Sequence, residues 1–188
     1  DALLLKGFAS RISGNLEEAL SYYDEMIDLS HEIDYKKGIA KAKTGKGVIY
    51  FIKGDFRKSL IENKAAVKIG EEIDKPDILV EAYNNLSSTY NGLGKLKKSL
   101  YYRQLVIQLY ADSGNTRELA VAYMNLGVFH YYRNDYDKAL INYKIAVNIH
   151  DENMDSEKAV TFNNIALVFE KTDQLDSAQF YYNKSIAI

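Results

Sequence analysis

The sequence predicts an all-α fold, and three observations support this prediction. Only one proline occurs among the 188 residues, although a chain of this length at the average frequency of about 5% would contain roughly nine. Hydrophobic residues make up 47% of the chain, which is enough to bury a sizeable core. A sequence pattern also recurs five times, at intervals of 40, 40, 40 and 39 residues. The chain is therefore predicted to be an array of helical hairpins that stack on one another.

Each of the five units has the same order of small, turn and apolar residues. The first helix of a unit carries a small residue where two helix backbones approach closely, at Gly7, Gly47, Ser87, Gly127 and Ala166. A residue that tolerates a left-handed conformation then ends this helix, at Gly14, Gly54, Gly94, Asn134 and Asp173. The second helix carries another small residue, at Ala19, Ser59, Ser99, Ala139 and Ala178. We expect a single array over residues 1–188, with repeats at approximately 1–34, 35–75, 76–114, 115–154 and 155–188.

Composition and charge exclude several classes of protein. The formal net charge of −2 lacks the excess of positive charge that a general nucleic-acid binder needs. The absence of Cys excludes a disulfide framework and a cysteine nucleophile. No apolar run approaches the ~20 residues needed to span a bilayer, so we expect no membrane partner and favour a cytoplasmic location, with an extracytoplasmic sensor segment as the alternative. Because the chain begins with Asp1, we expect it to be a piece of a longer protein.

The repeated residues resemble those of the tetratricopeptide repeat (TPR) family over essentially the whole chain. In the fourth unit, for example, the family's positions fall on Gly127, His130, Ala139 and Tyr143. The usual repeat has about 34 residues, and the longer repeats of this chain are similar to those of spindle-orientation adaptors and of bacterial regulators that sense peptides or contact kinases. The resemblance implies an α-α superhelix, a solenoid of about five hairpins. It also implies that the first helices line a concave groove that binds a protein or peptide partner.

Asparagine recurs on the predicted groove at Asn85, Asn125 and Asn164, although Asn is a poor residue for a helix interior. A side-chain amide can pair with both backbone groups of an extended peptide. The alternative is a ladder of amides that bridges adjacent helices and fixes the stacking of the repeats. Tyr131 and Tyr132 lie near a turn on the same face. The complete set of groove candidates is Lys41, Thr44, Phe51, Asn84, Asn85, Ser88, Asn125, Tyr131, Tyr132, Asn163 and Asn164.

The first helix of the second unit is unusually basic. Lys43 and Lys46 occupy positions that hold large apolar residues in other units. Because burial of an unpaired charge is costly, we expect their aliphatic stems to pack while their ammonium groups reach water. As a functional alternative, Lys41 and a neighbouring lysine would bind an acidic partner.

The sequence offers little support for catalysis. The three histidines, His31, His130 and His150, lie in different units without the spacing of metal ligands, and no phosphate-binding glycine loop or nucleophile elbow occurs. We therefore predict a non-enzymatic interaction module without a cofactor or metal. One alternative is a ligand- or peptide-sensing segment of a larger bacterial transcription regulator or sensor kinase. Another is a spacer that self-associates through the C-terminal hairpin, where Ile188 lacks a polar capping helix.

Overall fold

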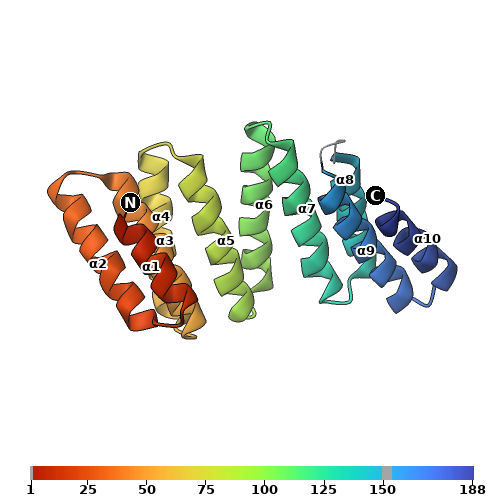
Figure 1. Cartoon of the computed structure of the whole chain (residues 1–188), viewed down its shortest axis with the longest axis horizontal. Helices are drawn as coiled ribbons and strands as arrows, with labels where there is room; N and C mark the ends of the chain where they lie inside the picture. The colour runs from red at the N-terminus through yellow and green to blue at the C-terminus, as the bar shows by residue number, and fades with distance from the viewer. Residues whose placement is uncertain (1, 150–153) are drawn as a thin grey trace. The chain divides into compact units, whose positions relative to one another are not determined.

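The computed structural model describes residues 2–149 and 154–188, and over these ranges the chain forms ten α-helices and no strand. Short turns join consecutive helices within each of the two described ranges (Figure 1). The helices are α1 (Ala2–Ile12), α2 (Leu16–Glu32), α3 (Lys36–Ile52), α4 (Phe56–Glu72), α5 (Pro76–Gly92), α6 (Leu96–Asp112), α7 (Thr116–Tyr131), α8 (Tyr136–Ile149), α9 (Asp155–Lys171) and α10 (Leu175–Ile186). The predicted all-α fold class is confirmed for the described part of the chain.

The turns within the hairpins use the residues that the sequence predicted for them. Their backbone φ angles are positive at Gly14, Gly54, Gly94, Asn134 and Asp173. Three turns between hairpins also contain a left-handed residue that was not predicted, at Asp34, Asp74 and Gly114. Asp74 has a φ of 51°, a conformation that Asp adopts more readily than most residues because its short side chain bonds locally. Pro76 follows it at the first position of α5, where a missing N–H costs nothing.

The described chain divides into two compact units, residues 1–106 and 107–188, and the boundary falls inside α6. Each unit is described by itself below. The prediction of a single array over all 188 residues stays a prediction.

The core of unit 1 forms where the second helix of the first hairpin packs between two first helices. Ala19, Tyr23, Ala42 and Ile49 are among its buried residues. The ring of Tyr23 lies directly on Gly7, because a Cβ added at Gly7 would be 2.7 Å from a ring carbon. The small residue predicted at this position is thus required by a close approach between α1 and α2.

The core of unit 2 repeats this arrangement. Tyr143 of α8 is buried with Phe162, Ile165 and Val168 of α9, and a Cβ added at Gly127 would lie 2.5 Å from the Tyr143 ring. The small residues predicted on the second helices are all buried, namely Ala19, Ser59, Ser99, Ala139 and Ala178. The register of the sequence repeat therefore matches the packing inside both units.

Candidate functional site

The first helices of unit 1 leave a row of apolar side chains uncovered. Helix α3 contacts both α1 and α5, so the three helices form one continuous surface, which we call the first-helix face of unit 1. Phe8 and Ile12 of α1 and Phe51 and Ile52 of α3 are exposed residues of these helices, Ile12 to 66% and Ile52 to 51%. Exposed apolar side chains gathered on neighbouring helices are typical of an interaction surface.

Polar groups occupy other positions of the same face. Lys41 is half-buried, and the Thr44 hydroxyl donates a hydrogen bond of 2.8 Å to the Lys41 backbone carbonyl. Thr44 is only 1% exposed. Of these two groove candidates, Lys41 therefore offers a side chain to a partner, while Thr44 offers almost no surface.

The Glu81 carboxylate interacts with two cations, Lys41 and Arg11. Glu81 is an exposed residue, but partial desolvation of its carboxyl group raises its pKa, while the charge of Lys41 and the Thr44 hydroxyl act in the opposite direction. Burial likewise raises the pKa of the Tyr23 hydroxyl, and Arg11 opposes that shift. Because Arg11 also acts on Glu81, these side chains influence one another electrostatically, and we call Arg11, Tyr23, Lys41 and Glu81 the polar cluster of α1, α2, α3 and α5.

The Asn85 amide takes part in packing between two adjacent hairpins. It donates a hydrogen bond of 3.1 Å to Oδ1 of Asn63 on α4, and the buried Asn63 amide donates in turn to the Ser59 carbonyl of the same helix. This geometry supports the ladder interpretation at Asn85. On the same helix, Asn84 is exposed and Ser88 is half-buried, so Asn84 presents the more accessible amide.

The structure pairs Lys43 and Lys46 with carboxylates at partly exposed positions, which the sequence did not predict. The Lys43 ammonium lies 3.1 Å from Glu62, and that of Lys46 lies 2.5 Å from Asp24 and 3.7 Å from Glu62. Burial alone would lower the pKa of Lys46, but the hydrogen bond to Asp24 and the charge of Glu62 raise it above its ordinary value. Both acidic partners come from the second helices α2 and α4, which the pattern of the first helices does not reveal.

The remaining groove candidates belong to unit 2. Tyr132 follows α7 directly, and the others lie on α7 and α9. These two helices contact each other. Tyr131 is half-buried, with its ring centroid 5.8 Å from that of Tyr136 and 5.7 Å from that of Tyr132. Tyr132 is 78% exposed. The amide candidates differ in accessibility: Asn125 and Asn163 are exposed, and Asn164 is half-buried.

Within the described ranges, no cluster of three or more His, Cys, Asp or Glu side chains has the arrangement needed to hold a metal ion. No described helix has the length and apolar character needed to cross a membrane.

The family model for the tetratricopeptide repeat matches residues 77–152 and 118–188, which together cover more than half of the chain. The chain belongs to the tetratricopeptide repeat family. No curated protein sequence matches it.

Solved structures share the TPR fold of this chain at low sequence identity. BtubC (BKLC) from P. vanneervenii has a TM-score of 0.81 and 20% identity, over 96% of this chain and 76% of its own. The apo form of RapI has a TM-score of 0.78 and 18% identity, over 97% of this chain and 51% of its own. The Rap conjugation gene regulator of the plasmid pLS20, in complex with the Phr* peptide, has a TM-score of 0.67 and 18% identity, over 98% of this chain and 52% of its own. This TPR chain thus spans about half the length of the Rap structures, and the likeness places it among the TPR-like helical solenoids.

The repeat pattern of this TPR chain does not by itself connect Arg11, Glu81 and Tyr23 with one another. Tyr23 comes from a second helix and reaches the site past two glycines, Gly7 and Gly45, since a Cβ at Gly45 would lie 2.5 Å from its ring. A glycine inside a helix usually destabilises it. Gly45 was therefore the signal in the sequence that a side chain from another helix passes at this point.

Proposed function

We propose that this TPR chain is a protein-interaction module that binds an extended peptide or a helix of a partner on the first-helix face. The observation that carries the proposal is the uncovered apolar row of unit 1. Covering a side chain such as Ile12 or Ile52, each more than half exposed, would contribute about 1 kcal/mol or more. A partner segment with spaced apolar residues would fit such a row.

The polar groups beside this row supply the contacts that would orient the partner. The exposed Asn84 amide is suited to pair with the backbone of an extended segment. The cluster of Arg11, Lys41 and Glu81 is suited to charged or polar groups of the partner. In unit 2, Asn163 offers an exposed amide and Tyr132 offers an exposed ring.

Two comparisons support a binding role over a catalytic one. The family to which the chain belongs is a repeat family, whose stacked helices provide extended surfaces for binding. The Rap regulator of plasmid pLS20, which shares the fold, is in complex with the Phr* peptide. We therefore propose a peptide segment as the ligand class and assign no catalytic step to the chain.

A matched pair of variants tests this proposal. Peptides that bind the chain are first selected from a random display library, and their affinities are then measured by fluorescence anisotropy. Ile52→Ser should weaken binding about fivefold, since it removes about 1 kcal/mol of apolar contact on the first-helix face. Ile61→Ser is the control, because Ile61 is similarly exposed at 58% but lies on the second helix α4. Equal affinities for the two variants would contradict binding on the first-helix face.

The Rap structures also favour a second candidate function, in which this chain is the sensing segment of a larger regulator. They carry the same fold over about half of their length. A sensing segment changes its conformation when the ligand binds, because the ligand must distinguish two states of the protein. Small-angle X-ray scattering of the chain with and without a selected peptide tests this role. An unchanged radius of gyration favours the simple binding module.

A further inference from the structure

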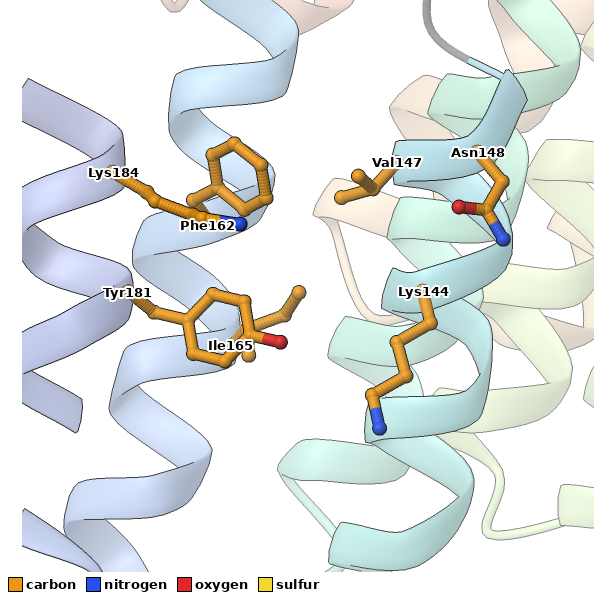
Figure 2. Close-up of a pocket in the computed structure, with 7 residues that line it drawn as sticks. All are labelled: Lys144, Val147, Asn148, Phe162, Ile165, Tyr181 and Lys184. Atoms are coloured by element: carbon orange, nitrogen blue, oxygen red, sulfur yellow. The ribbon is translucent and has the colours of Figure 1, made fainter. Parts of the chain in front are cut away.

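A pocket of about 230 Å³ opens in unit 2. It lies between α8 and α10, and α9 forms its floor (Figure 2). Phe162 and Ile165 are the buried floor residues, and Val147 and Tyr181 form half-buried walls. We call this space the outer pocket. Its volume is below the range of about 300–1,000 Å³ typical of drug-sized ligands, so it fits a single side chain.

Two lysines stand at the rim of the outer pocket, one on each side. Lys184 extends from α10 across the floor, and its ammonium lies 5.4 Å from the ring centroid of Phe162 and 5.8 Å from that of Tyr181. Lys144 belongs to the opposite helix, α8 (Figure 2). Both lysines are exposed, and neither pairs with a carboxylate in the described part of the chain. The pocket thus combines an apolar interior with positive charge that is not neutralised there.

The equivalent crevice in unit 1 shows how this chain fills such a space by itself. By the register of the repeat, Lys43 and Lys46 occupy the positions of Phe162 and Ile165, and Asp24 occupies that of Lys144. There the lysines of the first helix pair with acidic residues of the second helices, at 2.5 Å from Lys46 to Asp24 and 3.1 Å from Lys43 to Glu62. In unit 2 the cations stand on the second helices, and the position of Glu62 is held by Tyr181. The negative charge that completes the unit 1 crevice is missing from the outer pocket.

We propose that the outer pocket is a second binding site that takes an acidic segment of a partner protein, in which an aromatic residue stands next to a Glu or Asp. The aromatic ring enters between Val147 and Tyr181 and packs on the apolar floor beside the Lys184 ammonium, which lies 5.4 Å from the ring centroid of Phe162. The neighbouring carboxylate pairs with Lys144 and Lys184 at the rim, as Asp24 pairs with Lys46 in unit 1. This site is separate from the first-helix face, so either one can be refuted without the other.

The test uses two short peptides that differ in one charge, acetyl-Gly-Phe-Glu-Gly-amide and the same peptide with Gln in place of Glu. Binding is followed by NMR at the methyl groups of Ile165 and Val147, with the buried methyl groups of Ile49 in unit 1 as the reference. The Glu peptide should shift the first two signals and leave Ile49 unchanged. The Gln peptide should bind about fivefold more weakly, because it loses ion pairs that are each worth up to about a fivefold change in affinity at a partly exposed site.

Lysine variants separate the outer pocket from general attraction of acidic peptides. Lys144→Gln should weaken the Glu peptide about two- to fivefold and leave the Gln peptide unchanged. Lys97→Gln is the matched control, because Lys97 is an exposed lysine of unit 1 whose replacement changes the net charge equally. Equal affinities of the two peptides, equal effects of the two variants, or the absence of shifts at Ile165 and Val147 would each overturn the proposal.

Discussion

Replacing Glu62 by Gln tests the ion-pair network of unit 1 most directly. The substitution keeps the shape of the side chain, removes the carboxylate that pairs with Lys43, and leaves Lys46 paired with Asp24. The side chains of Lys46 and Glu62 are 13% and 15% exposed. Their interaction therefore falls between an exposed ion pair, worth about 0–1 kcal/mol, and a fully buried one, whose disruption costs about 3–5 kcal/mol. We expect Glu62→Gln to lower the free energy of unfolding by about 1–3 kcal/mol.

Urea unfolding followed by circular dichroism measures this change, and Glu17→Gln provides the control. Glu17 also pairs with a lysine, Lys53, but its side chain is 80% exposed, so its loss should cost less than about 0.5 kcal/mol. The dependence of the unfolding free energy on urea concentration should be the same for both variants as for the parent chain. This check is needed because a repeat array can lose cooperativity, which changes that slope. If Glu62→Gln is no more destabilising than Glu17→Gln, the interior pairing of Lys43 and Lys46 contributes nothing and the reasoning is wrong.

Three further predictions concern packing, the asparagine row and titration. Ala139→Leu should lower the free energy of unfolding by about 1–3 kcal/mol in urea, because Ala139 is fully buried and has no room for three more carbons. Asn85→Ala should lower the free energy of unfolding by about 0.5–1.5 kcal/mol, because it removes a hydrogen bond to a buried amide of α4. Asn125 is exposed, so Asn125→Ala should leave the free energy of unfolding unchanged in the same assay. The hydrogen bonds from Arg117 and Ser156 hold the pKa of Glu157 at about 2, against an ordinary 4.5, so this carboxylate stabilises the fold above about pH 4.5 and that contribution is lost as the pH falls toward 2. Arg117→Gln should move the NMR titration midpoint of the Glu157 carboxyl carbon upward, and an unchanged midpoint would refute the pairing.

The fold was predictable because the residues that determine it act locally and recur. Gly54 and Asp173 end their helices through their own backbone preferences, and Gly127 is needed because a neighbouring ring fills its position. The turns between hairpins were missed because Asp34 and Asp74 are ordinary acidic residues in sequence, and only the backbone reveals their positive φ. A pattern that repeats five times compensates for such gaps, since one well-read unit fixes the register of the others.

The candidate site was less predictable because its contacts join residues from different helices. The sequence placed Lys46 at an apolar position and predicted an ammonium group in water, but its partners, Asp24 and Glu62, lie 22 and 16 residues away on either side in the chain. Aligning the second helices as well as the first would have brought these carboxylates opposite the lysine, because positions that share a register share a crevice. The same alignment sets Ile165 where Lys46 stands and Lys144 where Asp24 stands. One crevice is thus neutralised from within, and its equivalent in unit 2 is apolar at the floor and cationic at the rim. Because a repeat fold keeps the backbone constant while each crevice takes its own side chains, binding specificity in such a chain is to be read by comparing equivalent positions between repeats.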